Sequence, residues 1–348
     1  GTARADSLAE SEALDLLVES LWRQGHAPRA ATAELAERAL ALGERLLAPD
    51  DPRRAAGLLN LGTVRLQRGE YAVAGPLLAR ALALRERAPG ADSLDYAWAL
   101  NGWAMWLQAE ARSAEALRAR ERVLELRRRA LGDDHALVGW SEANLAYQHQ
   151  AMGDFRRAEE WFRRAVATQE RAQGPDHPDV ASALKNLANL LLGMGRYDEA
   201  APLFERALAI RERAFGGDHA EVANSLNDLA SLRRAVGDYA AARGGVERAL
   251  AIRERVFGPD HPEVATSLVN LAGLLAEMGN DAHARRCYER AIAIRERVQG
   301  AAHASTAIAL EGLALVAERQ GRREEAEALA RRALAAKERG LGRGHPSV

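Results

Sequence analysis

Aspartate–histidine pairs are the most chemically suggestive residues in this chain of 348 amino acids. They recur every 42 residues, at Asp134-His135, Asp176-His177, Asp218-His219 and Asp260-His261. Such a pair could exchange protons, and several could bind a metal ion if they converged. Metal ligands must approach to about 2 Å, whereas packed helices lie roughly 8–10 Å apart, so pairs on successive layers form a row. We therefore expect Asp or His to cap a helix, with Pro178 and Pro262 in a first turn, and we expect no metal site.

A histidine and a cysteine form the second arrangement with potential reactivity. His283 and Cys287 lie four residues apart on one predicted helix, and the chain has no other cysteine. A nucleophile also needs an oriented base and an oxyanion site, which this pattern does not supply. An ordinary surface cysteine is the better interpretation. We predict no catalytic residue and no cofactor, and therefore no enzyme.

The charge balance limits the classes of partner. The chain has 48 basic and 49 acidic side chains, and a neutral chain lacks the basic surplus that nucleic acids and anionic lipids require. No stretch approaches the roughly 18 uncharged apolar residues of a membrane span. We expect a cytoplasmic protein that binds neither nucleic acid nor membrane. Arginine-rich segments such as Arg211-Glu212-Arg213 alternate in sign and are expected on a solvated face.

An internal repeat must position all of these residues. Glycine recurs in phase at Gly90, Gly132, Gly174, Gly216, Gly258, Gly300 and Gly342. A fixed period of 42 residues indicates a solenoid array. In-phase units cover residues 52–345, and residues 8–51 resemble one more, so we expect a single array of about eight units over residues 8–348. Residues 1–7 are expected to be a leader, and Ser7 with Glu10 matches a capping box that predicts the first helix start.

Each unit is predicted to be a helical hairpin. In residues 181–215, one amphipathic stripe runs through Leu184 and Leu191, Gly195 supplies a turn, and a second stripe contains Ala200 and Phe204. A single hairpin leaves apolar surface open on both sides, so neighbouring units must stack. The predicted fold is an all-α solenoid of about sixteen helices without strands.

These residues carry a family resemblance. The spacing of the tetratricopeptide repeat is matched by Leu184, Leu187, Ala188, Leu191, Gly195, Tyr197, Ala200, Phe204 and Ala207. The segment GPDHPDVA at 174–181 resembles the longer, kinesin-light-chain type. The resemblance implies a right-handed superhelix whose concave wall is built from the first helix of each hairpin, and a peptide-binding scaffold. The pattern departs from the family at Ala111, in the place of a turn glycine, and at Ser113, Asp281 and Arg323, in the place of a tyrosine.

Positions that vary between units mark the candidate binding face. In the unit at 181 they share one side of the first helix, at Ser182, Lys185, Asn186, Asn189 and Leu192. The column of Asn186 contains Asn60, Gly102, Asn144, Asn186, Asp228, Asn270 and Gly312. An amide offers both a donor and an acceptor, as an extended peptide backbone requires. The alternative is that these amides bridge neighbouring helices inside the solenoid.

Aromatic side chains add a second feature to this face. Trp98 and Trp140 hold the place of Ser182 in neighbouring units, and Met105 and Tyr147 hold the place of Asn189. They could accept an apolar anchor between the indoles, or they could only pack between units. Trp103 replaces a packed leucine and is expected in the core.

We predict a non-enzymatic scaffold that holds an extended peptide, from a protein partner or from other domains of its own parent chain. The predicted groove residues are Trp98, Asn101, Met105, Trp140, Asn144, Tyr147, Lys185, Asn186, Asn189, Asn227, Arg234 and Asn270. Lys185 and Arg234 would favour an acidic ligand. The alternative is a structural or self-association module. Because 342–348 repeat the linker pattern, the final helix, around 326–337, is expected to expose apolar surface and to favour end-to-end self-association.

Overall fold

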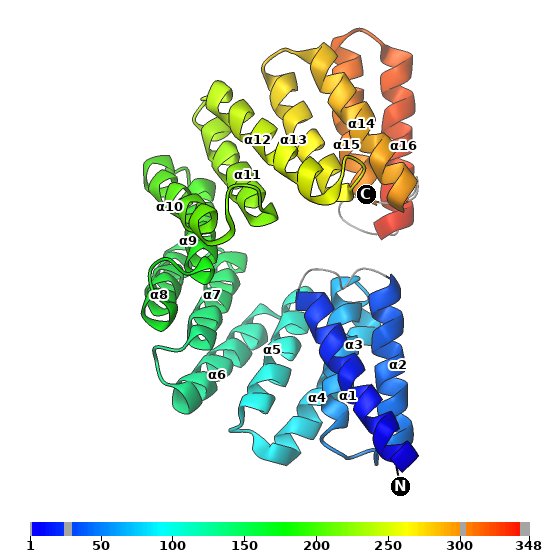
Figure 1. Ribbon diagram of the computed structural model, residues 1–348, viewed down its shortest axis with the longest axis vertical. Helices are drawn as coiled ribbons and strands as arrows, with labels where there is room; N and C mark the ends of the chain where they lie inside the picture. The colour runs from blue at the N-terminus through cyan, green and yellow to red at the C-terminus, as the bar shows by residue number, and fades with distance from the viewer. Residues whose placement is uncertain (1, 24–29, 300–303, 342–348) are drawn as a thin grey trace. The chain divides into compact units, whose positions relative to one another are not determined.

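The computed structural model describes residues 2–23, 30–299 and 304–341 (Figure 1). These residues form sixteen α-helices and one π-helical turn, η1 (Glu86–Gly90), with no strand among them. Consecutive helices pack as hairpins, which confirms the predicted all-α class and the hairpin unit. Gly300, Gly342 and the linker-like segment 342–348 lie outside the described residues.

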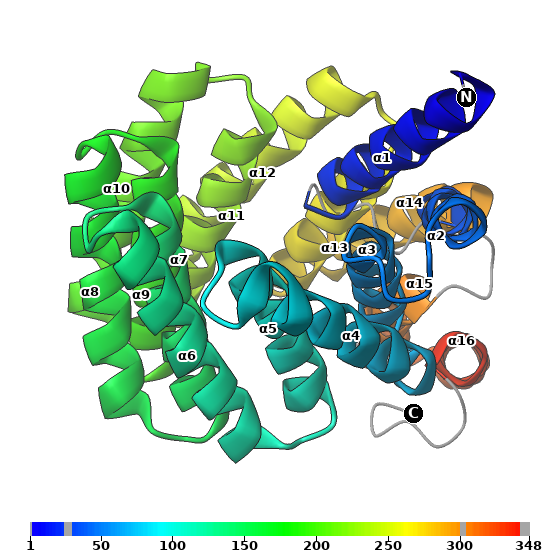
Figure 2. The same cartoon turned by 90° about the horizontal axis from the view of Figure 1, so that it is seen from below.

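Contacts divide the chain into two units, Gly1–Pro175 and Asp176–Val348, each with four hairpins. The first contains α1 (Thr2–Arg23), α2 (Ala30–Leu46), α3 (Arg54–Gln67), α4 (Tyr71–Arg85), α5 (Leu94–Ala109), α6 (Ser113–Leu131), α7 (Ala136–Ala151) and α8 (Phe155–Gln173). The second contains α9 (Pro178–Gly193), α10 (Tyr197–Phe215), α11 (Ala220–Ala235), α12 (Tyr239–Phe257), α13 (Pro262–Glu277), α14 (Asp281–Gln299), α15 (Ala304–Arg319) and α16 (Arg323–Leu341). The partners α3 and α4 lie side by side in both views (Figures 1 and 2). That residues 8–348 form one continuous array stays a prediction.

The first helix begins earlier than expected. Helix α1 starts at Thr2, so the expected leader is part of the helix and Ser7 lies inside it rather than at its start. Residues 2–6, Thr-Ala-Arg-Ala-Asp, contain no glycine or proline to stop a helix, and a capping-box match of two residues is a weak boundary signal.

The hairpin turn depends on a left-handed residue. Gly195 has a φ of 74°, a conformation that costs a glycine little because it lacks a Cβ atom. In the hairpin of α5 and α6 this place is held by Ala111, which adopts a φ of 58°. The departure at Ala111 therefore does not break the hairpin. An alanine in this region stores roughly 1–2 kcal/mol of strain.

The aspartate–histidine pairs are structural, as expected. In each pair the histidine caps the next helix: Nδ1 of His177 accepts from the amide of Asp179 at 3.2 Å, and Nδ1 of His261 accepts from Glu263 at 3.2 Å. The aspartate instead pairs with an arginine near the end of the same hairpin, as Asp218 does with Arg255 at 2.6 Å. The helix cap is therefore the histidine, and the aspartate ties the loop to the second helix of the hairpin that follows it.

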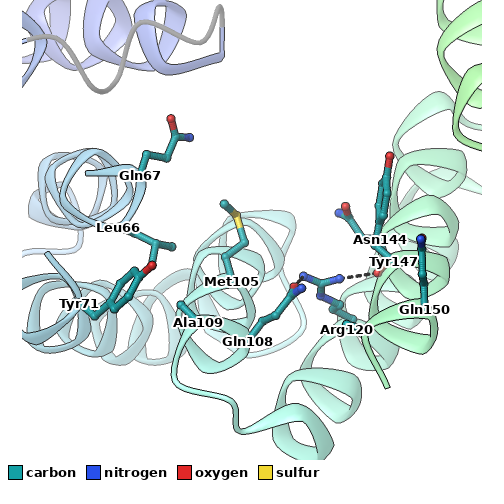
Figure 3. A pocket seen from close by; sticks show the side chains of 11 residues that line it. Leu66, Gln67, Tyr71, Met105, Gln108, Ala109, Arg120, Asn144, Tyr147 and Gln150 are labelled. Carbon is teal, nitrogen blue, oxygen red and sulfur yellow. Dashed lines mark hydrogen bonds between the residues drawn. The ribbon is translucent and has the colours of Figure 1, made fainter. Parts of the chain in front are cut away.

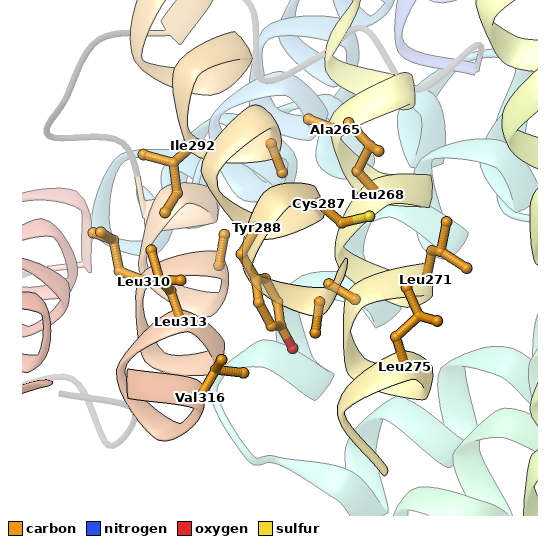
Figure 4. Close-up of a cluster of buried hydrophobic side chains, with 14 of the residues drawn as sticks. Ala265, Leu268, Leu271, Leu275, Cys287, Tyr288, Ile292, Leu310, Leu313 and Val316 are labelled. Carbon is orange, nitrogen blue, oxygen red and sulfur yellow. The ribbon is translucent and has the colours of Figure 1, made fainter. Parts of the chain in front are cut away.

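The apolar core runs between successive hairpins. Figure 4 shows one such cluster, where side chains from α13, α14 and α15 meet around Cys287 and Tyr288. Cys287 is 6% exposed, so it is a core residue and not the expected surface cysteine. Burial raises the pKa of its thiol, which disfavours the reactive thiolate.

A column of buried arginines links the layers, which corrects the expectation that Arg211 is solvated. Arg211 is 3% exposed and donates from Nη1 to Ser225 Oγ at 2.7 Å and from Nη2 to Ser182 Oγ at 3.3 Å. The related members of the column are Arg127, Arg253 and Arg295. The neighbouring helices supply hydroxyl and carboxylate acceptors, so the buried charge is satisfied. Only Arg213 of the predicted pair is exposed, and it binds Asp176 at 2.7 Å.

Candidate functional site

A groove of about 770 Å³ opens in the first unit at the carboxyl ends of α3, α5 and α7 (Figure 3). These are the first helices of three successive hairpins, which the sequence predicts to form the binding face. The groove is lined by Leu66, Gln67, Tyr71, Met105, Gln108, Ala109, Arg120, Asn144, Tyr147, Gln150 and Ala151. It combines apolar side chains with side-chain amides.

Three predicted residues line this groove: Met105, Asn144 and Tyr147. The Tyr147 side chain is 43% exposed, and its ring packs edge-to-face on Phe162 with 5.0 Å between ring centroids. Because Phe162 is fully buried, this contact fixes the tyrosine ring on a rigid support. The structure thus presents a preorganised aromatic surface on α7.

The amides of the column are used partly inside the protein. Asn144 Nδ2 donates to Asn101 Oδ1 at 3.3 Å, which bridges α7 to α5. Asn60 Nδ2 donates to the Asp15 carbonyl at 2.9 Å, and Asn60 Oδ1 accepts from Trp22 Nε1 at 3.2 Å. The bridging alternative therefore holds for Asn60 and for the pair of Asn101 and Asn144.

Close packing explains two interruptions of the column. A Cβ atom on Gly102 would lie 2.7 Å from Leu59 Cδ1, and one on Gly312 would lie 2.3 Å from Tyr288 Cζ. Neighbouring side chains already fill the space that an asparagine would need. These positions belong to the packing between hairpins.

The two predicted tryptophan anchors do not line the groove of Met105 and Tyr147. Trp98 is half-buried in a second cavity of about 490 Å³ that Trp22 and Asp15 also line, and the Arg127 guanidinium lies 4.8 Å from the centre of its ring. Trp140 is 53% exposed on α7. Trp103, expected in the core, is partly buried and stacks on Trp106 with 4.4 Å between centroids.

The other predicted residues belong to the second unit. Asn189 and Asn270 are exposed, and Lys185 and Asn186 are half-buried. Both side-chain polar atoms of Asn227 are buried without a hydrogen bond to a described residue. Arg234 donates from Nε to Glu277 Oε2 at 2.7 Å, so its charge is already compensated. Burial raises the pKa of Asp228, an effect that the positive charge of Lys185 opposes.

Sequence reasoning missed Gln108, Arg120 and Gln150. Both glutamines stand one helical turn beyond the predicted residues, in the column of Leu192, and could have been found there. Arg120 lies on the second helix of its hairpin, where no contact with a ligand was expected. Its side chain is 6% exposed, and burial lowers its pKa to about 10.

Residues 2–23, 30–299 and 304–341 contain neither a metal-binding cluster nor a membrane-spanning helix. There, no three His, Cys, Asp or Glu side chains gather closely enough to hold a metal ion. None of the helices described has both the length and the apolar character of a membrane span.

Comparison with protein families agrees with the repeat. Matches to the tetratricopeptide repeat cover residues 53–118, 95–171, 138–213, 179–244, 233–297 and 270–339. The chain belongs to the tetratricopeptide repeat family. The resemblance seen in the spacing of Leu184, Gly195 and Phe204 is thereby confirmed. A search of curated proteins found no match to this tetratricopeptide repeat chain.

Solved structures include other tetratricopeptide repeat proteins of the kinesin-light-chain type. BtubC (BKLC) from P. vanneervenii is 27% identical, with a TM-score of 0.59 over 67% of this chain and 94% of that one. The nearly identical repeats of a putative kinesin light chain from Podosopora anserina are 24% identical, with a TM-score of 0.50 over 59% of this chain and 98% of that one. The apo form of RapI is 15% identical, with a TM-score of 0.55 over 83% of this chain and 99% of that one. The tetratricopeptide repeat fold is a protein-interaction scaffold, and the family match does not indicate a catalytic family.

Proposed function

We propose that the chain binds an extended peptide segment of a protein partner, or of another domain of its parent chain, in the groove along α3, α5 and α7. The observation that carries this proposal is the continuity of the groove over three hairpins, with apolar Leu66, Met105 and Tyr147 beside the amides of Gln67 and Gln150. Apolar surfaces accept side chains, whereas amides match the donors and acceptors of a main chain. A volume of about 770 Å³ is within the range of ligand sites.

The second unit offers a more polar face for the same purpose. Asn186, Asn189 and Asn270 continue the same columns on α9 and α13, and Lys185 is the basic residue of this face. We assign them to main-chain contacts with a ligand. Arg234 is the weakest member of the predicted set because Glu277 binds its guanidinium.

Self-association is the second candidate function, and the last hairpin favours it. Ile308 and Leu315 on α15 are 59% and 62% exposed, and Leu334 on α16 is 45% exposed. Leu334 is the one large apolar side chain that is exposed in residues 326–337, beside the exposed Ala328 and Ala330, and the larger exposure lies on the preceding helix. Contact between copies would cover these side chains.

An array of random octapeptides, acetylated and amidated so that both ends are uncharged, tests the binding proposal. We expect Tyr147→Ala and Met105→Ala each to weaken binding of the octapeptides selected by the wild-type chain by at least tenfold. Tyr239→Ala is the matched control, since Tyr239 is 38% exposed on α12 and lies outside the groove. Equal binding by all three variants would refute the groove.

Light scattering tests the second candidate on the same protein. A chain that binds no octapeptide but dimerises, and that becomes monomeric with Leu315→Ser, would establish self-association instead. We expect the wild-type chain to bind octapeptides and Leu315→Ser to leave that binding unchanged.

A further inference from the structure

Arg120 occupies a place that apolar residues hold in the equivalent units. At intervals of 42 residues the same position contains Leu78, Phe162, Phe204, Val246, Tyr288 and Ala330. Phe162, Phe204 and Leu78 are fully buried there. The position is therefore a core position of the second helix, and an arginine in it is an exception within this chain.

The Arg120 guanidinium is buried without a counter-ion. It is 6% exposed and donates to the Asn144 carbonyl and to Gln108 Oε1, whereas its Nε has no hydrogen-bond partner. No carboxylate of a described residue forms an ion pair with it. Two buried arginines elsewhere differ, because Arg211 lies 3.3 Å from Glu221 and Arg253 lies 3.5 Å from Glu263. Arg295, which also has no ion pair among the described residues, donates to the Ser305 carbonyl and to Thr266 and does not line the groove. A buried, uncompensated charge destabilises a fold, and at Arg120 this charge also lines a groove that a ligand can enter.

The arginine lies at the floor of the groove. Figure 3 shows its side chain reaching from α6 toward α7, beside Gln108 and below the space that Met105 and Tyr147 flank. Of the described residues that line the groove, Arg120 alone carries a charge. An anionic group of a ligand would find one cation here, surrounded by neutral amides and apolar side chains.

We infer that Arg120, held by Gln108 and the Asn144 carbonyl, is an anion subsite that pairs with a single carboxylate of the bound peptide. This inference rests on the proposed function and names its ligand class more closely. A planar guanidinium matches the two oxygens of a carboxylate, and the low-polarity surroundings strengthen the pair. The carboxylate comes from an Asp or Glu side chain or from the peptide's C-terminus, which present the same chemistry.

Two octapeptide arrays separate these sources. One is acetylated and amidated, so that only Asp and Glu side chains carry negative charge, and the other has free C-termini and no Asp or Glu. In the first array, we expect the wild-type chain to bind peptides with Asp or Glu more tightly than neutral peptides. In the second array, we expect it to bind peptides with a free C-terminus more tightly than their amidated versions. Either preference, or both, supports the inference. No preference for a carboxylate in either array would overturn the inference even where neutral peptides bind.

The variant Arg120→Leu tests the residue itself, because leucine is native at the equivalent position 78. We expect at least tenfold weaker binding of the carboxylate peptides, less than twofold change for neutral ones, and an unchanged or higher melting temperature. Arg118→Leu removes an equal charge from an exposed position of the same helix and should change neither. Equal loss for acidic and neutral peptides, or no loss, would refute the subsite. If Arg120→Leu fails to fold, the preference of the wild-type arrays decides alone.

A small probe keeps failure of the inference distinct from failure of the proposed function. N-acetyl-leucine carries a carboxylate, and N-acetyl-leucinamide has the same shape without the charge. In a chain labelled with ¹⁵N-arginine, we expect the acid to shift the Arg120 Nε–H resonance in a saturable manner and the amide to leave it unchanged. If the acid alone shifts the resonance but no octapeptide binds, the peptide groove is refuted and the anion subsite is retained. Equal shifts from both compounds would refute the subsite.

Discussion

Arg253 on α12 donates from Nη1 to Ser267 Oγ on α13 at 2.6 Å, and the two groups are almost completely buried. The same guanidinium donates from Nη2 to Asn224 Oδ1 on α11 at 2.7 Å. One arginine thus joins both helices of its own hairpin to the first helix of the next. Because Arg211 repeats this arrangement with Ser182 and Ser225, the link is a property of the repeat.

We expect Ser267→Ala to destabilise the protein, because it leaves a buried guanidinium hydrogen without an acceptor. The cost of such a loss is about 1–3 kcal/mol, and thermal unfolding should show a melting temperature several degrees lower. Ser231→Ala removes a hydroxyl from an exposed position of α11 and should change the melting temperature by less than about 2 °C. Equal effects of the two substitutions would contradict a stabilising role for the buried link.

Gly312→Ala should destabilise the second unit although alanine favours helices. Its Cβ would lie 2.3 Å from Tyr288 Cζ, and overpacking of this kind costs about 1–3 kcal/mol. Gly244→Ala is the control, because nothing lies within 4 Å of its Cβ, and there we expect a gain of up to about 1 kcal/mol. Denaturant unfolding measures both.

The double variant Gly312→Ala with Tyr288→Val identifies the cause. Valine is native at the equivalent position 246, so it should relieve the clash and recover part of the lost stability. Additive losses in the double variant would show that the tyrosine ring is not what excludes the Cβ atom.

Asp15→Asn should stabilise the protein above about pH 6. Burial, together with the like charges of Glu12 and Glu19, raises the pKa of Asp15 from 3.8 to about 6, although a hydrogen bond from Asn60 opposes the rise. The folded chain therefore holds this proton more tightly than the unfolded chain, and the ionised carboxylate costs stability as the pH rises from 3.8 through 6.

Melting curves across pH check this sign. The stabilisation by Asp15→Asn should be several degrees at pH 7.5 and should shrink as the pH falls from 6 toward 3.8. A gain that is independent of pH would contradict the raised pKa. Glu10→Gln is a suitable control, because the exposed Glu10 carboxylate pairs with Arg38 at the surface.

The two tryptophans of the predicted anchor should differ in their effect on stability. Trp98→Ala removes a half-buried ring that the Arg127 guanidinium covers at 4.8 Å, so we expect a melting temperature several degrees lower. Trp140→Ala truncates a ring that is 53% exposed, so the melting temperature should change by less than about 2 °C. Calorimetry of both variants is the measurement, and equal losses would show that Trp140 also packs between hairpins.

Sequence periodicity was sufficient to predict the hairpins. The residue types at Gly195, Leu184 and Phe204 recur because every unit needs the same turn geometry and the same packing between two adjacent helices. The capping histidines such as His177 were likewise predictable, since a cap involves residues two positions apart. Local rules failed at the start of α1, where a short capping signal competed with a segment that readily forms a helix.

The tertiary structure alone decided which side chains share a cavity and which charges are buried. Sequence columns place Trp98 and Met105 on one face, yet the two line different cavities because they lie toward opposite ends of α5, about 10 Å apart along the helix. Arg211 resembled a solvated residue until Ser182 and Ser225, 29 and 14 residues away, supplied its acceptors. Arg120 was visible as an arginine in an apolar column, but its missing counter-ion was not. Burial and pairing depend on contacts between hairpins, which a single repeat does not encode.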